Sequence, residues 1–370
     1  CMNQLFRWDQ TGLFLLALAA GILPFAVPEV CAAALREGLT LCSGPLLLSL
    51  FPFLVVSRLL IQCPESDLLA LPFRLAAWGI GIRTPCAARV LCIGFLGGFA
   101  PAASAAAQAV RTGQLTAEEA DALLPACICS GPSFVVLTVG QSLLGSAELG
   151  VLLFASQITA NYLTAALLNR FAGVRSVKPG SAAPASPAPP RLDEILADAA
   201  ITYCKLCGFI LFFRMLAAGA GALLPAGAGT LCAILLEVCS GCDLASRTGR
   251  WGSLLCCAAL SVQGLSVLLQ VRTICPPEMT LRPLYRSRLL HLPLSLALFY
   301  LLLPGGEADV FSTLPARVLL MRRVPPDCAL LVFAVCCMAA CTLRSGIRQV
   351  EQKQMARNAG GCCINSKTLL

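Results

Sequence analysis

Long stretches without any charged residue limit the fold of this chain more than any other feature. Crossing the hydrocarbon layer of a bilayer takes roughly 20 apolar residues, with a range of about 17–25. Most of the uncharged runs reach that length, and they cover 10–28, 38–57, 90–110, 122–147, 149–169, 215–236, 251–271, 289–306 and 328–343. In lipid, backbone groups must bond within their own helix or within a closed barrel. The runs are too long and too evenly apolar for the alternating strands of a barrel.

We therefore expect an all-α, polytopic membrane helix bundle of about eight to ten hydrophobic segments, some of them broken or re-entrant. Composition agrees, because 58% of the 370 residues are hydrophobic and 12% are charged. A soluble domain carries about 25% charged residues. The sequence predicts a multi-pass protein of the cell membrane whose main partner is the lipid bilayer.

The net charge of +8 does not indicate nucleic-acid binding. Lys and Arg are spread over short loops and the C-terminal tail, where they orient helices across the membrane. The tail after 343 has one acidic residue, Glu351, and its basic residues are Arg344, Arg348, Lys353, Arg357 and Lys367. We expect this tail in the cytoplasm.

The N-terminal region leaves two questions open. Cys1 precedes Met2, and the sequence does not decide whether Cys1 is a genuine N-terminus or a lipidated one. The run 10–28 fits both a signal peptide and a transmembrane helix. We expect a first transmembrane helix, because no soluble domain follows it.

The chain contains 22 cysteines, and many of them lie inside apolar runs. A buried free cysteine behaves as a small hydrophobic residue. Two C-x-x-C pairs, Cys204/Cys207 and Cys239/Cys242, are close to the number that chance gives with so many cysteines. They motivate a membrane thiol enzyme as one hypothesis. No histidine-rich context accompanies them, and a structural zinc site needs four ligands. We expect no metal and no cofactor.

The sequence carries no pattern typical of an enzyme. It shows no Ser-His-Asp set, no phosphate-binding glycine loop and no His-Glu metal motif. Its one histidine, His291, precedes Pro293, near an expected loop. We therefore predict that the protein is not an enzyme.

One change of composition divides the chain. Residues 172–192 are rich in Pro, Ala and Ser, as in an extended, solvated linker. The linker separates a first membrane half, 1–171, from a second membrane half, 193–345. A basic cytoplasmic tail, 346–370, follows.

The two halves echo each other. Residues 38–60 resemble residues 200–216, because in both segments polar residues are followed by aromatic residues and then by an arginine. Residues 95–104 occupy the same place in the first half as residues 235–246 in the second half, and residues 125–140 correspond to residues 257–271. Each half would contain an apolar helix, a broken segment of small residues, and a second broken helix with polar atoms. An internal repeat is one interpretation, and coincidence within a small apolar alphabet is the other.

Glycine and proline interrupt the runs in corresponding places of the two halves. Breaks inside membrane helices are tolerated where protein or a water-filled cavity satisfies the freed backbone groups. Paired interruptions point to a midplane binding site, whereas small residues also allow close helix packing. The expected breaks are at Gly97, Gly98, Pro101, Gly131, Pro132, Gly241 and Gly264.

Polar residues lie near these expected breaks. Glu237 ends the run 215–236, and a carboxylate inside a membrane indicates function unless it is solvated or paired at a helix end. Gln263, Ser266 and Gln270 are spaced to share one helix face, which would line a cavity or bond a neighbouring helix. The candidate intramembrane polar site consists of Glu237, Ser240, Gln263, Ser266, Gln270 and Ser130.

Between the two interrupted segments of the first half, the spacing of Thr116 and Glu119 is typical of a capping box. Glu118, Glu119 and Asp121 suit the positive end of the helix that would follow. We interpret this stretch as a surface turn leading into a helix, and we assign its carboxylates no catalytic role.

Residues 94–140 resemble the YlbJ-type sporulation integral membrane proteins, which carry the Gate or nucleoside-recognition domain. In the first half the matching residues are Gly98-Phe99, Thr112-Gly113-Gln114-Leu115, Ser130-Gly131-Pro132 and Thr138-Val139-Gly140. In the second half they are Leu236-Glu237 with Gly241, and Gly264-Leu265-Ser266-Val267 with Gln270. The chain departs from the family pattern at Pro101, Ala102, Ile128, Cys129 and Val262-Gln263.

This resemblance implies a role in spore formation as a permease-like or channel-like component for an unknown small solute. The implied partners are that solute and other sporulation membrane proteins. The alternative is a non-transporting structural protein of the developing spore membrane.

Overall fold

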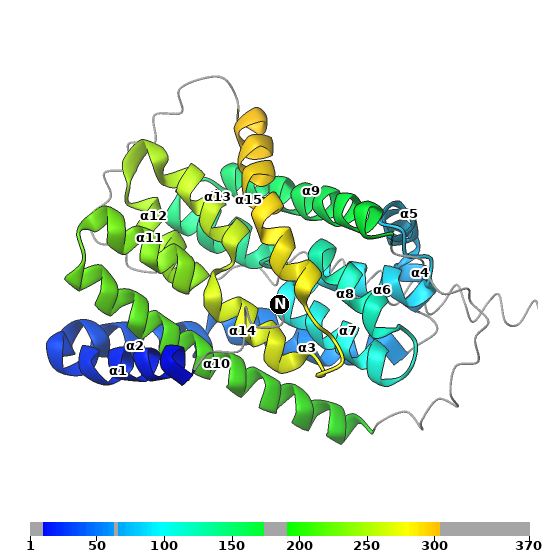
Figure 1. Ribbon diagram of the computed structural model, residues 1–370, viewed down its shortest axis with the longest axis horizontal. Coiled ribbons are helices and arrows are strands. Elements are labelled where there is room, and N and C mark those ends of the chain that lie inside the picture. The colour runs from blue at the N-terminus through cyan, green and yellow to red at the C-terminus, as the bar shows by residue number, and fades with distance from the viewer. Residues whose placement is uncertain (1–9, 63–65, 174–190, 304–370) are drawn as a thin grey trace, which may run out of the picture.

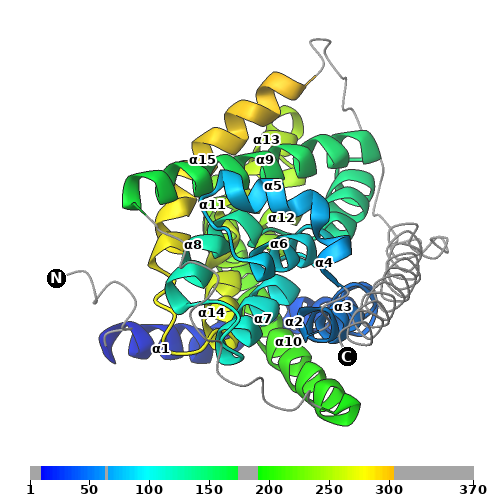
Figure 2. The same ribbon diagram turned by 90° about the vertical axis from the view of Figure 1, so that its right-hand side faces the viewer.

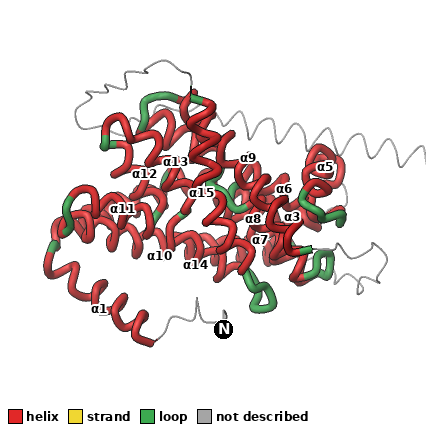
Figure 3. The backbone as a smooth tube through the Cα atoms, turned by 45° about the horizontal axis from the view of Figure 1, so that its top comes forward, coloured by secondary structure: helices red, strands yellow, loops and turns green. Residues whose placement is uncertain are grey.

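The computed structural model describes residues 10–62, 66–173 and 191–303, and this part of the chain is built of helices joined by short loops (Figure 3). The expected all-helical architecture is therefore confirmed for these residues. Cys1, most of the linker, the run 328–343 and the basic tail lie outside the described residues.

The helices follow one another with short connections. In chain order they are α1 (Gln10–Ala26), α2 (Pro28–Ser43), α3 (Pro45–Gln62), α4 (Ser66–Leu69), α5 (Leu71–Gly79), α6 (Pro85–Gly97), α7 (Phe99–Arg111), α8 (Ala117–Cys127), the π-helix η1 (Ser133–Leu143), α9 (Ala147–Ala172), α10 (Leu192–Leu223), α11 (Ala226–Leu236), α12 (Val238–Ser246), the 3₁₀ turn η2 (Gly249–Trp251), α13 (Gly252–Val262), α14 (Gly264–Ile274) and α15 (Arg282–Leu302).

Within the described residues, four helical stretches are long and apolar enough to cross a membrane, which indicates a multi-pass membrane protein. They are Pro28–Ile61, Ala147–Ala172, Leu192–Leu223 and Gly249–Ile274. Shorter apolar helices accompany them at Leu16–Ala26, Pro85–Gly97, Ser133–Leu143 and Gly227–Leu236. The expected set of about eight to ten segments thus divides into long and short helices, because several uncharged runs are split by a break.

The two longest helices lie on opposite sides of the bundle (Figure 1, Figure 2). On one side, α9 packs against α8, η1 and α15. On the other side, α10 packs against α2, α3 and α11. The short helices α7, α8 and α14 lie between them. The centre of the molecule is therefore made of helices too short to span a bilayer alone.

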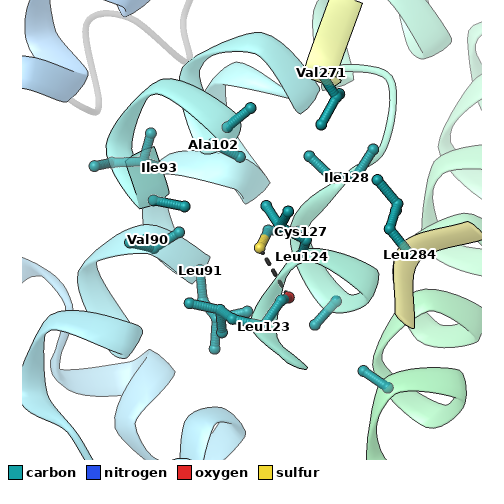
Figure 4. Packing of buried hydrophobic residues seen from close by; sticks show 14 of the residues in the cluster. Val90, Leu91, Ile93, Ala102, Leu123, Leu124, Cys127, Ile128, Val271 and Leu284 are labelled. Carbon is teal, nitrogen blue, oxygen red and sulfur yellow. Dashed lines mark hydrogen bonds between the residues drawn. The ribbon is translucent and has the colours of Figure 1, made fainter. Parts of the chain in front are cut away.

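Small residues allow these central helices to approach closely. The helix α7 is rich in alanine, and its alanines are buried on all sides, as expected for a helix surrounded by protein. Side chains of α6, α8 and α14 pack around it (Figure 4). Cys127 donates from its thiol to the carbonyl of Leu123 at 3.1 Å. The buried cysteines thus act as small core residues.

The capping box predicted before α8 is confirmed. The hydroxyl of Thr116 accepts from the backbone N–H of Glu119 at 3.1 Å, and the Glu119 carboxylate accepts from the N–H of Thr116 at 3.2 Å. The expectation that this turn is superficial is wrong in one respect. Glu119 and Asp121 are buried, because each binds a partner far away in the sequence. Glu119, for example, accepts from the hydroxyl of Thr84 at 2.6 Å.

Asp121 ties α8 to the start of α15. Its carboxylate accepts from the backbone N–H of Thr280 at 2.8 Å, from the Thr280 hydroxyl at 2.6 Å and from the N–H of Leu281 at 3.1 Å. Leu281 has a positive φ of 56°, a conformation that costs free energy in a residue other than glycine. The carboxylate therefore stabilises a strained turn.

We expect Asp121→Asn to lower the free energy of unfolding by about 1.5–3 kcal/mol, because hydrogen bonds to a charged group are lost and an amide N–H faces backbone donors. Thermal unfolding of the purified protein in detergent measures the effect. The matched control is Glu118→Gln, since Glu118 lies on the same helix and is exposed. Equal melting midpoints for the two variants would contradict the assigned role.

Candidate functional site

Two helix breaks meet in the first half of the chain. Gly98 separates α6 from α7 with φ 80° and ψ −162°, a conformation essentially restricted to glycine. Residues 128–132 separate α8 from η1. A Cβ atom on Gly98 would lie 2.6 Å from the backbone nitrogen of Gly131. The first break therefore packs directly on the second, backbone against backbone.

Two further breaks meet in the second half. Glu237 separates α11 from α12 in an extended conformation, with φ −152° and ψ 125°. Gln263 separates α13 from α14 in the left-handed conformation, with φ 66°. A Cβ atom on Gly264 would lie 2.9 Å from the backbone nitrogen of Glu237. The third break thus packs on the fourth in the same manner.

Most residues predicted to interrupt helices lie at or beside these breaks, namely Gly97, Gly98, Gly131, Pro132 and Gly264. Pro101 lies in the first turn of α7, where its missing N–H has no helical partner to lose. The prediction for Gly241 is wrong, because this residue lies inside α12. A Cβ on Gly241 would lie 2.8 Å from the Cα of Ile234. Gly241 therefore allows close packing of α12 on α11.

A cavity of about 50 Å³ is lined by residues at or beside the first three breaks and by residues of α14, the helix that follows the fourth break. A single water molecule needs about 10–15 Å³ by this measure, so the cavity has room for a few waters or one small chemical group. Its lining residues are Leu46, Leu50, Gly97, Phe99, Ser130, Gly131, Ser133, Phe134, Ile210, Glu237, Val238, Cys239, Val267 and Gln270. We call this space the central cavity.

Glu237 is the charged residue of the central cavity, and its side chain also caps α12. The residue is 2% exposed. One carboxylate oxygen, Oε1, accepts from the N–H of Cys239 at 2.8 Å. The other, Oε2, accepts from the N–H of Ser240 at 2.7 Å and from the Ser240 hydroxyl at 2.9 Å. These bonds stabilise a negative charge at the positive end of α12.

Gln270 and Ser130 bring further polar side chains to the same cavity, and Gln270 has an atom that is unpaired within the described part of the chain. The amide nitrogen of Gln270 donates to the hydroxyl of Ser266 at 2.9 Å, while its Oε1 has no hydrogen-bond partner among the described residues. Ser130 lines the same cavity and is buried. Buried polar groups are normally paired, so Oε1 of Gln270 is available to a ligand or to water.

Gln263 does not share a helix face with Ser266 and Gln270. The expected spacing required one continuous helix, and the helix is interrupted at Gln263 itself. Its side chain turns back and donates to the carbonyl of Leu260 at 3.1 Å. The prediction of a common face therefore applies to Ser266 and Gln270 alone.

The starts of two short helices add to the polarity of the central cavity. Phe99 is the first residue of α7, Ser133 is the first of η1, and both line the cavity. Neither helix has a side-chain cap at its N-terminus. Free backbone N–H groups give a helix N-terminus a partial positive charge. The cavity thus combines one carboxylate with several backbone dipoles, which suits binding of a small polar group.

A second set of buried polar side chains lies between α9, α13 and α15, and it was not predicted from the sequence. We call this set the polar seam, and it consists of Gln157, Asn161, Thr164, Ser261, Arg288, His291 and Ser295. Gln157 donates to the Ser261 hydroxyl at 3.0 Å, and Arg288 donates to Asn161 Oδ1 at 3.0 Å.

The signal for the polar seam was present in the sequence. Gln157, Asn161 and Thr164 are spaced i, i+4, i+7, and Arg288 and His291 are spaced i, i+3, so each set shares a helix face. The expectation that His291 lies near a loop is wrong. It is buried in the middle of α15, because its ring Nε2 pairs with the carbonyl of Gln157 at 3.2 Å.

The C-x-x-C pairs lie on helices rather than in a shared site. Cys204 and Cys207 are on α10, Cys239 and Cys242 are on α12, and all are free thiols. Among the described residues, no group of three or more His, Cys, Asp or Glu side chains is arranged to hold a metal ion.

Comparison with family models, with curated proteins and with solved structures finds no significant match to this chain. Function must therefore be inferred from the geometry of the central cavity and from the residue pattern of the sequence.

Proposed function

We propose that this chain is a multi-pass protein of the cell membrane, of the sporulation type that carries the Gate domain. In this proposal it acts as a permease-like or channel-like component for a small polar solute. The observation that carries the proposal is the meeting of the helix breaks around one cavity that contains Glu237 and the open amide end of Gln270.

The free-energy cost of these polar groups supports the proposal. A buried carboxylate and unpaired backbone groups at membrane depth are expensive, and proteins keep them where a polar ligand or water passes. Paired broken helices with sites at their ends are the usual construction of a transporter midplane site.

The order of the elements supports the proposed division into similar halves, 1–171 and 193–345. In the first half, the broken pair α6–α7 is followed by the broken pair α8–η1 and then by the long helix α9. In the second half, α11–α12 is followed by α13–α14 and then by α15. We propose that these two series are an internal repeat.

We expect Glu237→Gln to reduce uptake of the transported solute and spore yield by about tenfold or more, because a hydrogen bond to a charged group contributes about 1.5–3 kcal/mol. The control is Glu148→Gln, since Glu148 is exposed in the first turn of α9. Unchanged uptake and spore yield in the Glu237 variant would contradict the assignment of a solute site to Glu237.

A ligand screen on purified protein identifies the solute class. Small polar solutes, of a size that fits a cavity of about 50 Å³, are added in turn at saturating concentration, and the melting midpoint is measured. A ligand at 100 times its Kd adds about 2.7 kcal/mol of stability, which corresponds to a shift of roughly 3–4 °C for a chain of 370 residues. A shift that is present in Glu148→Gln and lost in Glu237→Gln supports the proposed site.

The alternative function is a non-transporting structural protein of the developing spore membrane. The contact between η1 and α9 favours it, because Gly140 and Gly150 bring the two backbones together. A Cβ on Gly140 would lie 2.5 Å from the Cα of Gly150, and such small-residue contacts are typical of helix assembly in membranes. Reconstituted vesicles without solute flux, together with stable protein partners in pull-down experiments, would favour this alternative.

A further inference from the structure

Arg288 is a buried cation without a carboxylate partner among the described residues. It is 8% exposed, and it lies on α15 in the middle of the polar seam. Removing one charge from water costs several kcal/mol unless nearby groups compensate for it. The position therefore requires an explanation from the acceptors that surround the guanidinium.

Those acceptors belong to two different helices besides α15. The guanidinium donates to Asn161 Oδ1 on α9 at 3.0 Å and to the backbone carbonyl of Ser261 on α13 at 3.4 Å. It also donates to the neighbouring Ser287 hydroxyl at 3.2 Å. Ser261 lies in the last turn of α13, where carbonyl groups have no partner in the helix and carry a partial negative charge. The end of α13 thus compensates for part of the arginine charge.

Asn161 extends the same network to the other half of the chain. Its amide nitrogen donates to the carbonyl of Ile128 at 3.3 Å. Ile128 is the residue that ends α8 and opens the second break. Through one asparagine, Arg288 therefore holds the end of α8 as well as the end of α13.

We propose that Arg288 is the positioning residue of the central cavity, tying together the ends of the broken helices α8 and α13. The residues that follow these ends line the cavity, with Ser130 two residues after Ile128, and Gln270 in the second turn of α14 after Gln263. Arg288 itself does not line the cavity. Its role as an organiser of a solute site rests on the proposed function, whereas its hold on the two helix ends does not.

The experiment uses two native cysteines of the full chain as reporters. Cys129 lies in the break that Arg288 holds, and Cys86 lies at the start of α6; both are buried. Purified protein is treated with a water-soluble maleimide, and mass spectrometry of the peptides gives the labelling rate of each thiol. The ratio of the two rates separates local opening of the break from global unfolding, which exposes both cysteines together.

We expect Arg288→Gln to raise the ratio of Cys129 to Cys86 labelling about tenfold, and Arg288→Lys to give an intermediate ratio, because lysine keeps the charge and loses the fork of donors. Asp121→Asn is the control, since it loosens the start of α15 without touching the polar seam. It should leave the ratio within about twofold of the unsubstituted protein.

An unchanged ratio in Arg288→Gln, or a rise equal to that in Asp121→Asn, would overturn the proposal. The result of the ligand screen is independent of the labelling result, so the two experiments test the solute function and the role of Arg288 separately. If no ligand shifts the melting midpoint but the labelling ratio rises, Arg288 still holds the breaks, and only the solute function is lost. If a ligand binds but the ratio does not change, the assignment of Arg288 falls and the solute function stands.

Discussion

Gly98→Ala is expected to lower the free energy of unfolding by about 2–6 kcal/mol, one of the two largest effects expected for this chain. The backbone of Gly98 has a conformation that costs another residue about 1–3 kcal/mol. The added methyl group would also lie 2.6 Å from the backbone of Gly131, and overpacking of that kind costs about 1–3 kcal/mol more. Thermal unfolding in detergent should show a midpoint lower by roughly 3–8 °C.

Gly145→Ala separates the two contributions. Gly145 also has a positive φ, of 77°, but no atom lies within 4 Å of a Cβ at that position. We expect it to show the conformational cost alone. If the Gly98 and Gly145 variants have the same melting midpoint, the close contact between the first and second breaks adds no cost to the Gly98 substitution.

The second large effect is expected at Gly140, where η1 crosses α9. Gly140→Ala should cost about 2–3 kcal/mol or more, because the atoms that the new methyl would meet at 2.5 Å and 2.7 Å belong to the backbone of Gly150 and have no room to move aside. The added methyl group would push η1 away from α9, on which it packs. The loss of stability is measured by the same unfolding experiment, and labelling of Cys129 reports whether the neighbouring break opens.

Gly208→Ala is the control for this substitution, and its effect should have the opposite sign. Gly208 lies within α10 and is exposed, and a Cβ at this position would meet no atom within 4 Å. Replacing glycine by alanine in an open helical position stabilises a helix by about 0.5–1 kcal/mol. If Gly208→Ala also lowered the free energy of unfolding, the cost of Gly140→Ala could not be assigned to the close contact with Gly150.

Much of the fold could be predicted from the sequence because lipid leaves few options to a long uncharged run. The all-helical architecture and the candidate span at Ala147–Ala172, which contains the uncharged run 149–169, follow from run length. The span Leu192–Leu223 does not, because it contains five charged residues and takes only the first part of the predicted run 215–236. The breaks at Gly98 and Gly131 also carry a recognisable signal, since glycine and proline interrupt helices for reasons of backbone geometry.

Other features of the candidate site have no such local signal. Glu237 breaks its helix by capping the next one with its own side chain, and Gln263 breaks its helix by adopting a left-handed conformation. Neither break can be predicted from the type of residue at that position. The polar seam depends on three helices meeting, so Asn161 and Arg288 gain their meaning from tertiary contacts rather than from their neighbours in the chain.

The way in which Glu237 caps α12 restricts how it recognises anything else. A carboxylate offers about four lone-pair directions, two on each oxygen. Oε2 already accepts two donors from Ser240, and Oε1 accepts one from Cys239. At most one acceptor direction is left, on Oε1, and the side chain of Cys239 also interacts with this carboxylate. A ligand that needs both carboxylate oxygens of Glu237 must first break the hydrogen bonds that cap the start of α12.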